Sequence, residues 1–324
     1  MATTASTRDF WGTVGARIGL IRNIYRVVPG LYAVGSPGPE SSVLVTANYK
    51  LSFDALRLQL SGVDAWILVL DTRGINVWCA AGKGTFSTEE MIQSVNRYRV
   101  GEVVNHRDLV LPQLAATGVT AREVKRACGF QVFFGPVRAA DLPAYLQQGK
   151  YGDEAMREVT FTLPERAILI PVELFLLAKP LLATLALGFV LSGIGPSLFS
   201  LNAALDRGLT LLGATLLGIM GGAVLMPLLL PWLPCRQFWL KGVLSGLAAA
   251  VASWLLLDTG RSLPEQLALF LWVMTVSSYL AMNFTGSTPF TSPSGVEYEM
   301  RRGIPVQIAA TCLTIVLWVG SPFF

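Results

Sequence analysis

Five apolar stretches of about twenty residues fill the second half of the chain and limit its fold more than any other feature. About 20 apolar residues in a helix cross the hydrocarbon core of a bilayer, so each stretch is long enough to span a membrane. Short polar or proline-rich connections separate them. The predicted spans are residues 168–194, 209–233, 238–257, 263–284 and 304–323.

Charge divides the chain at the same place. Residues 1–165 hold 17 of the 25 Lys+Arg and 15 of the 21 Asp+Glu, a density typical of a water-soluble domain. We therefore expect a soluble domain over 1–165 and an all-α transmembrane domain over 166–324. The net charge of +4 is not concentrated in one basic block, so a nucleic-acid-binding module is excluded.

The sequence also predicts an orientation. The first residues lack an apolar run behind basic residues, so no signal peptide is expected and the first domain should stay in the cytoplasm. Five spans then leave more basic residues in cytoplasmic than in external connections, as the positive-inside rule requires. We expect a multi-pass protein of the inner (cytoplasmic) membrane, with Arg236, Lys241, Arg301 and Arg302 inside and Arg207 and Arg261 outside.

Few ionisable residues fall within the spans. Glu173, Lys179, Lys241 and Glu265 lie near span ends, where snorkelling or interfacial ion pairs explain them. An ion-coupled pump usually needs more buried carboxylates. The spans are therefore expected to act as an anchor or passive scaffold, with the GxxxG pairs at 218–222 and 242–246 as possible helix-packing faces.

The soluble half reads as an α/β domain, because short apolar strands alternate with helical stretches. Such buried strands form a largely parallel sheet, whose ligands bind at the carboxyl ends of the strands. Strands are predicted over 42–47, 65–70, 102–104 and 130–134, and helices over 53–60, 120–128 and 142–147.

The turn at 71–84 (DTRGINVWCAAGKG) is the densest candidate site. Its spacing fits neither a Walker A loop nor a dinucleotide-binding G-x-G-x-x-G. A Cys–His nucleophile pair would have to use His106, the chain's one histidine. The four cysteines are far apart, which excludes zinc and iron–sulfur motifs. Cys79 is either a buried small hydrophobe or a reactive thiol.

The string NVWCAAGK at 76–83 resembles the cap-helix motif of the corrinoid protein of the anaerobic mercury-methylation pair. That family is similar to the corrinoid-binding domain of the corrinoid iron–sulfur protein of the acetyl-CoA pathway. The likeness extends from about Phe10 to the C-terminus. It includes residues 45–57, 64–86, 103–114 and 129–143, and FTGSTPFTS at 284–292.

The resemblance implies a Rossmann-like domain that holds a cobalt corrinoid, with Cys79 as its lower axial ligand and catalytic residue. His106 lacks the D-x-H-x-x-G context of a histidine ligand, and Lys83 and the helix that follows would favour a thiolate at Cys79. The expected cofactor-binding residues are Thr46, Asn48, Thr72, Asn76, Val77, Trp78, Cys79, Ala80, Ala81, Gly82, Lys83, Val137 and Ala139.

By the same resemblance, the function is a membrane-anchored methyltransferase that makes methylmercury from inorganic Hg(II). Its implied partners are a ferredoxin-like protein with two [4Fe–4S] clusters as electron donor and a methyltetrahydrofolate-linked methyl donor protein. Two alternatives stay open: a corrinoid methyl carrier for another acceptor in one-carbon metabolism, and a membrane transporter with a cytosolic regulatory domain.

Overall fold

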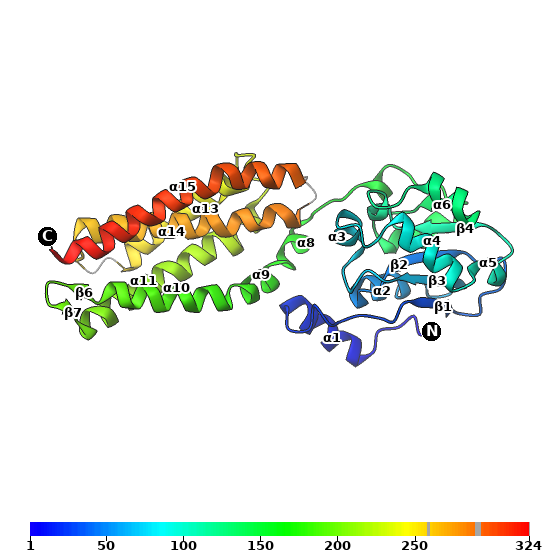
Figure 1. The fold of residues 1–324 in the computed structure, drawn as a ribbon, viewed down its shortest axis with the longest axis horizontal. Helices are drawn as coiled ribbons and strands as arrows, with labels where there is room; N and C mark the ends of the chain where they lie inside the picture. Colours follow the sequence, from blue (N-terminus) through cyan, green and yellow to red (C-terminus); the bar gives the residue numbers. More distant parts are fainter. Residues whose placement is uncertain (258–259, 289–292, 324) are drawn as a thin grey trace. The chain divides into compact units, whose positions relative to one another are not determined.

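The computed structural model describes the whole chain except residues 258–259, 289–292 and 324. The chain divides into two compact units, Met1–Thr160 and Phe161–Phe324 (Figure 1), called here the N-terminal and C-terminal units. The boundary falls a few residues before the expected 165/166. Thr162 and Glu165 form a capping box, so these residues already begin the first helix of the C-terminal unit.

A mixed five-stranded sheet forms the centre of the N-terminal unit, in the order β1-β3-β2-β4-β5. Four strands are parallel, as the apolar runs predict, and β1 pairs antiparallel with β3 at one edge. The sequence analysis missed β1, a short strand that is only half-buried. The strands are β1 (Gly30–Val34), β2 (Val43–Ala47), β3 (Ala65–Leu70), β4 (Asp108–Leu111) and β5 (Gln131–Phe134).

Helices cover both faces of this sheet. On one face, α2 (Lys50–Arg57) and α7 (Leu142–Gln147) pack in one apolar core. On the other, α4 (Thr88–Arg97) and α6 (Ala121–Cys128) close a second core. This confirms the α/β class and explains why the central strands are apolar along both faces.

The strand predicted at 102–104 is wrong. Those residues belong to α5 (Val100–Val103), a single turn in which the backbone N–H of Val104 donates to the carbonyl of Val100. Arg99 begins the turn with a φ of 51°, a left-handed conformation that interrupts extended backbone. The strand lies farther on, in β4, where Leu109, Val110 and Leu111 are buried.

The C-terminal unit is helical. Among the described residues it contains four helices long and apolar enough to cross a membrane, and up to five spans if one bent pair counts as a span. The four helical runs are Leu201–Leu229, Phe238–Leu256, Leu263–Ser287 and Ser294–Phe323. They contain α11 (Leu201–Ile219), α12 (Met226–Leu229), α13 (Phe238–Leu257), α14 (Leu263–Asn283) and α15 (Pro293–Gly320).

The first predicted span, 168–194, is broken. It consists of Leu163–Leu176 and Ala178–Ser192, which meet at 52°. Helix α9 (Ile170–Leu176) ends before Pro180, and α10 (Ala178–Ser192) continues beyond it. Proline has no N–H to donate to the carbonyl four residues earlier, here that of Leu176, and its ring clashes with that carbonyl, so the helix bends.

Two other spans begin earlier than expected. The run containing α11 starts at Leu201, because the Ser200 side chain accepts a hydrogen bond from the backbone N–H of Ala203 and caps the helix. The last helix starts at Pro293 rather than 304, so most of the connection predicted over 285–303 is helical. Residues 289–292, the end of the FTGSTPFTS motif, lie outside the described residues.

Both GxxxG pairs pack against α14. A Cβ added to Gly222 would lie 2.3 Å from the Ser277 carbonyl oxygen, and one added to Gly246 would lie 2.7 Å from the Ser277 Cβ. Only glycine allows backbones to approach this closely. The expectation that these pairs are helix-packing faces is confirmed.

Charged side chains inside the C-terminal unit make structural contacts. The guanidinium of Arg207 pairs with Glu265 at 2.8 Å and lies over the Trp318 ring, 4.5 Å from its centroid. Lys241 donates from Nζ to the carbonyls of Leu230 and Leu233. The Glu265 pair agrees with the expected ion pairing at span ends, whereas Lys241 donates to backbone carbonyls and forms no ion pair with a described acid. Both charges thereby take part in helix packing.

Candidate functional site

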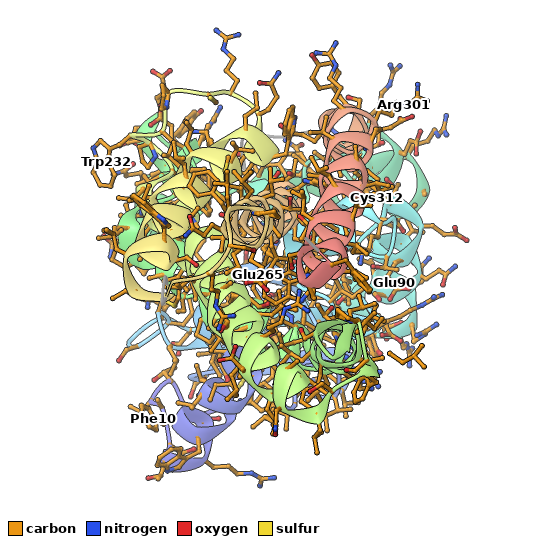
Figure 2. All side chains as sticks on the ribbon, turned by 90° about the vertical axis from the view of Figure 1, so that its left-hand side faces the viewer. Phe10, Glu90, Trp232, Glu265, Arg301 and Cys312 are labelled. Atoms are coloured by element: carbon orange, nitrogen blue, oxygen red, sulfur yellow. The ribbon has the colours of Figure 1, made fainter. Side chains whose placement is uncertain are left out.

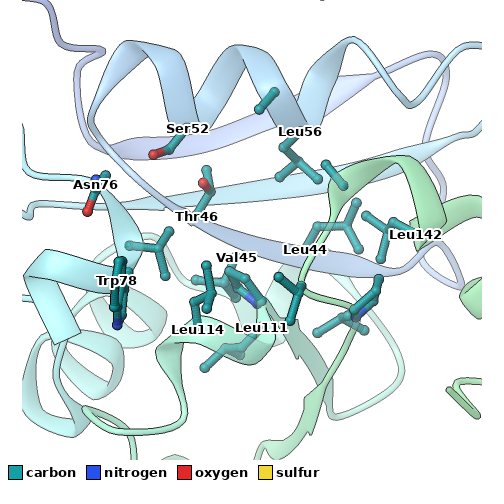
Figure 3. A pocket seen from close by; sticks show the side chains of 17 residues that line it. Leu44, Val45, Thr46, Ser52, Leu56, Asn76, Trp78, Leu111, Leu114 and Leu142 are labelled. Atoms are coloured by element: carbon teal, nitrogen blue, oxygen red, sulfur yellow. The ribbon is translucent and has the colours of Figure 1, made fainter. Parts of the chain in front are cut away.

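A cavity of about 310 Å³ lies at the carboxyl ends of the parallel strands (Figure 3). It opens between β2 and β4, where successive connections leave the sheet in opposite directions. Open α/β sheets bind their ligands at this switch point. The lining comprises Leu44, Val45, Thr46, Ser52, Ala55, Leu56, Asn76, Val77, Trp78, Val110, Leu111, Pro112, Leu114, Pro136, Val137, Ala139 and Leu142.

No charged side chain lines this cavity. Its polar side chains, Thr46, Ser52 and Asn76, lie toward one end, and Leu44 and Leu142 lie toward the other (Figure 3). A site of this character favours an uncharged, mainly apolar group that makes a few hydrogen bonds at one end.

Thr46 is the most informative polar group. It is 3% exposed and lines the cavity, yet its hydroxyl makes no hydrogen bond with another described side chain or with the described backbone. Its oxygen is open to the cavity and is not sealed in the core. The Thr46 hydroxyl can therefore bond a ligand atom, or an ordered water, in the cavity.

The loop after β3 leads into the short helix α3 (Val77–Gly82). Asn76 caps α3: its Oδ1 accepts a hydrogen bond from the backbone N–H of Cys79 at 2.8 Å. Val77 and Trp78 line the cavity, whereas Cys79 is half-buried beside it and is not part of the lining. The sequence thus places one thiol at the edge of the cavity.

The small residues of the motif differ in their surroundings. Ala80 and Ala81 are buried against the core, and a Cβ on Gly118 would lie 2.9 Å from the Ala81 Cα, so this close approach fixes α3 in place. Gly82 and Lys83 are exposed at the end of the helix. Nothing lies within 4 Å of a Cβ built on Gly82, so its surface is open to a large ligand.

Asn48 and Thr72, both predicted to contact the cofactor, are buried and brace the loop instead. Asn48 Oδ1 accepts hydrogen bonds from the backbone N–H groups of Thr72 and Gly74 and from the Thr72 hydroxyl. Its Nδ2 donates to Asp71 at 3.1 Å. Neither residue lines the cavity. Both act through the position of the loop that carries α3.

Ser87 and Glu90, at the start of α4, have the spacing of a capping box, but only half of that box is present. Ser87 accepts a hydrogen bond from the Glu90 backbone N–H. The Glu90 carboxylate, however, accepts from the Asp71 backbone N–H and from the Ser94 hydroxyl. Glu90 therefore ties α4 to the loop after β3.

His106 lies at the opposite edge of the sheet, just before β4 begins. Its Nδ1 accepts from the Asp108 backbone N–H, so Nε2 carries the proton and donates to the Ser41 carbonyl at 2.9 Å. Cys128 ends α6 at the amino edge and donates from Sγ to the Val124 carbonyl. Among the described His and Cys side chains of the N-terminal unit, Cys79 alone lies at the carboxyl edge. No group of three or more metal-ligating side chains occurs in the described part of the chain.

Val137 and Ala139 line the cavity, as predicted from the turn after β5. The sequence analysis missed several other lining residues. Leu111, Pro112 and Leu114 follow from the true position of β4, and the same carboxyl-end rule would have found them had that strand been placed correctly. Ser52, Leu56 and Leu142 come from helices and carried no such signal.

Comparison with known proteins identifies the domain that carries this site. Residues 21–146 match the family described as the CO dehydrogenase/acetyl-CoA synthase delta subunit. Subunit gamma of the acetyl-CoA decarbonylase/synthase complex of Archaeoglobus fulgidus is 32% identical over 129 residues, which is 39% of this chain and 27% of that subunit. The Methanopyrus kandleri subunit gamma is 33% identical, with 39% and 28% covered.

The chain thus spans about a quarter of the length of these curated relatives. The matched region contains every strand of the five-stranded sheet but none of the long apolar helices. Residues 21–146 form a domain related to the CO dehydrogenase/acetyl-CoA synthase delta subunit and to subunit gamma of acetyl-CoA decarbonylase/synthase.

Proposed function

We propose that the N-terminal unit binds a cobalt corrinoid with Cys79 as its lower axial ligand, and that the chain is a membrane-anchored methyltransferase with Hg(II) as acceptor. The observation that carries the proposal is the position of Cys79. It is the one described thiol at the carboxyl edge, on a helix that borders an uncharged cavity. The relation of residues 21–146 to subunits of acetyl-CoA decarbonylase/synthase supports a role in one-carbon chemistry.

The residues present fit such a cofactor. A thiolate is a soft ligand suited to a transition metal, and the competing donor, His106, is engaged at the other edge of the sheet. At about 310 Å³, the cavity is at the lower limit of the ~300–1,000 Å³ of small-molecule sites. It suits one part of a corrinoid, such as the aromatic base of a nucleotide tail, and leaves the macrocycle at the open surface of α3.

Each side chain then has a defined role. Cys79 donates to the metal, Trp78 covers apolar surface of the ligand, and Thr46 and Asn76 offer hydrogen bonds. Ala80, Ala81 and Gly82 keep the helix surface flat, and Lys83 adds positive charge. When bound, the corrinoid would supply the methyl group for Hg(II), and Cys79 would hold the cobalt and donate electron density to it.

The remaining partners belong to the same proposal. The described residues contain no cluster of metal ligands that would hold an iron–sulfur centre. Electrons that recharge the cobalt are therefore assigned to a separate ferredoxin-like protein with two [4Fe–4S] clusters, and the methyl group to a methyltetrahydrofolate-linked protein. The apolar helices support insertion into a membrane. We assign the N-terminal unit to the cytoplasmic face of the inner membrane, the side that the positive-inside rule favours.

The test combines colour and chemistry. The purified full chain should carry cobalt, absorb visible light as corrinoids do, and methylate Hg(II) when supplied with a reductant and a methyl donor. A colourless, cobalt-free protein that moves a solute across liposomes would overturn the proposal in favour of a transporter.

A second candidate keeps the cofactor and changes the acceptor. It is favoured by the relatives, which are subunits of a complex named for acetyl-CoA rather than for mercury. A corrinoid-loaded protein that passes its methyl group to a nickel or thiol acceptor, but not to Hg(II), would identify a methyl carrier of one-carbon metabolism.

A further inference from the structure

The N-terminal segment presents an apolar face that no described part of its own unit covers. In α1 (Thr7–Ile18), the side chains of Phe10, Val14 and Ile18 recur at helical spacing, with Trp11 beside them. Phe10 is 60% exposed and Trp11 65% exposed. Figure 2 shows Phe10 on the outer side of this helix. Exposed aromatic residues gathered in one patch mark an interaction surface.

Exposed apolar side chains continue along the chain after α1. Leu20, Ile24 and Val28 are each at least 65% exposed. Large apolar side chains so exposed are scattered singly on an ordinary soluble surface, whereas here they follow one another along twenty residues.

The opposite face of α1 is firmly attached, so the exposure is not that of a loose terminus. Ala16 is fully buried, and Gly12 lies so close to Tyr25 that a Cβ there would overlap its ring. Asp9 pairs with Lys50 at 2.8 Å and with Arg57 at 2.9 Å, which joins α1 to α2. The apolar face is therefore held outward.

Unpaired positive charge accompanies this face. The side chains of Arg17 and Arg22 lie near Tyr49, with the Arg22 guanidinium 5.9 Å from the centroid of the Tyr49 ring. No described acid lies within ion-pair distance of either arginine. Arg17 Nε and Tyr49 Oη are buried without a hydrogen-bond partner. Two arginines beside the same tyrosine, neither with a carboxylate partner, suit an anion such as a phosphate.

We propose that residues 7–28 are an interfacial element that lies on the membrane surface, with its apolar face among the acyl chains and Arg17 and Arg22 on the phosphates of anionic phospholipids. Aromatic side chains and arginine are the residues that favour this zone of a bilayer. The membrane is the occupant because the same chain carries the apolar helices, which keep a lipid surface within reach. The proposal rests on insertion of those helices and not on the corrinoid or its acceptor.

Brominated lipids test the apolar face, because bromine on the acyl chains quenches tryptophan that enters the bilayer. The full chain would be placed in phosphatidylcholine–phosphatidylglycerol nanodiscs with brominated chains, and Trp11→Phe compared with the unchanged protein. Trp66→Phe is the negative control, because Trp66 is half-buried in the sheet. Trp254→Phe is the positive control, because Trp254 is 53% exposed on an apolar helix.

Trp11→Phe should remove as much quenchable fluorescence as Trp254→Phe, and Trp66→Phe should remove none. If Trp11→Phe leaves the quenchable fraction unchanged, the proposal is overturned. Quenching by acrylamide would then show why. If acrylamide quenches Trp11, its side chain faces water. If neither reagent quenches Trp11, its side chain packs against protein.

Paired charge variants test the arginine site. Arg17→Gln/Arg22→Gln should remove the gain in Trp11 quenching that phosphatidylglycerol gives over pure phosphatidylcholine. The control is Arg122→Gln/Arg126→Gln, at two exposed positions of α6. It changes the net charge by the same amount as the first double variant and should leave that gain intact. Equal loss in both double variants, or no loss in either, would overturn the headgroup site.

Discussion

The two units each contain a cavity, and the two cavities differ in size and in the groups that line them. The cavity of the C-terminal unit is about 630 Å³, roughly twice that of the N-terminal unit. Four threonines line it, and three of their hydroxyls donate to a carbonyl of their own helix: Thr215 to Leu211, Thr275 to Leu271 and Thr311 to Gln307. These hydroxyls have no proton left for a ligand.

The smaller cavity differs in the two features that matter for binding. Thr46 offers a buried hydroxyl with no described partner, and Cys79 lies beside the cavity on a capped helix. In the C-terminal unit, Arg207 pairs with Glu265, and the described cavity-lining atom buried without a partner is Gln307 Oε1, an acceptor. Cavity size alone would thus favour the larger cavity, whereas a thiol beside an unpaired hydroxyl donor favours the sheet.

Removing the thiol should have the largest effect. Cys79→Ala and Cys79→Thr should abolish methyl transfer to Hg(II), a greater loss than the ~10–100-fold cost of removing a second-shell metal contact. Cys128→Ala is the matched control, because Cys128 lies at the other edge of the sheet. The measurement is the methylation rate of cobalt-loaded protein. Activity retained in both Cys79 variants would show that the two cavities do not differ in the way described.

Breaking the buried ion pair should damage the C-terminal unit alone. Arg207→Met leaves Glu265 with only the longer ion pair to Arg261, at 3.9 Å, and breaking such a buried pair costs up to ~3–5 kcal/mol of unfolding free energy. Arg301→Met, which breaks an exposed pair with Glu297, should cost about 1 kcal/mol or less. Detergent-induced unfolding followed by circular dichroism gives both values. An altered spectrum of the bound corrinoid in Arg207→Met would contradict the separation of roles.

Two threonines of the N-terminal unit separate ligand binding from structure. Thr46→Val removes a hydroxyl that makes no described hydrogen bond, so it should leave stability unchanged and weaken corrinoid binding by about 1 kcal/mol, roughly fivefold. Thr72→Val removes a donor to the loop and should cost about 1–3 kcal/mol of stability. Titration with corrinoid and chemical denaturation measure the two effects. Equal losses of stability in both variants would refute the assignment of Thr46 to the ligand.

Protonation of Asp9 at low pH should loosen α1, and this is the smallest of the expected effects. The hydrogen bond from Lys50, then that from the Ser6 backbone, holds the pKa of Asp9 well below its usual range. A depressed carboxyl pKa stabilises the folded state above about pH 4, the ordinary value for Asp, and this stability is lost as the pH falls toward the folded-state pKa. Asp9→Asn should remove this dependence and loosen α1 by about 1 kcal/mol or less. Hydrogen exchange of the α1 amides between pH 3 and 7 checks it. An unchanged pH profile in Asp9→Asn would place the acid sensitivity elsewhere.

The sequence predicts best what long patterns encode. Apolar runs such as Ala65–Leu70 predict the parallel sheet, and longer runs such as Phe238–Leu257 predict the helical unit. Both predictions hold because continuous apolar runs must be kept out of water. Local breaks are harder to predict. The bend before Pro180 and the early start at Ser200 depend on single residues within otherwise continuous apolar runs.

The motif and the strand ends predict part of the cavity lining. The lining residues that come from the surrounding helices are predicted less well. Asn76, Val77, Trp78, Val137 and Ala139 line the cavity as expected. Asn48 and Thr72 have the polarity of binding residues, but they hydrogen-bond each other, a partnership between positions 24 residues apart that no local pattern reveals. Ser52 and Leu142 line the cavity because helices cross the sheet at particular angles, and such packing is absent from the sequence pattern.

The lower ligand of the cobalt is the most direct test of the whole account. X-ray absorption at the cobalt edge of the purified, corrinoid-loaded full chain should find one sulfur neighbour in the unchanged protein and none in Cys79→Ala. A cobalt bound below only by nitrogen or oxygen in the unchanged protein would contradict the role of Cys79.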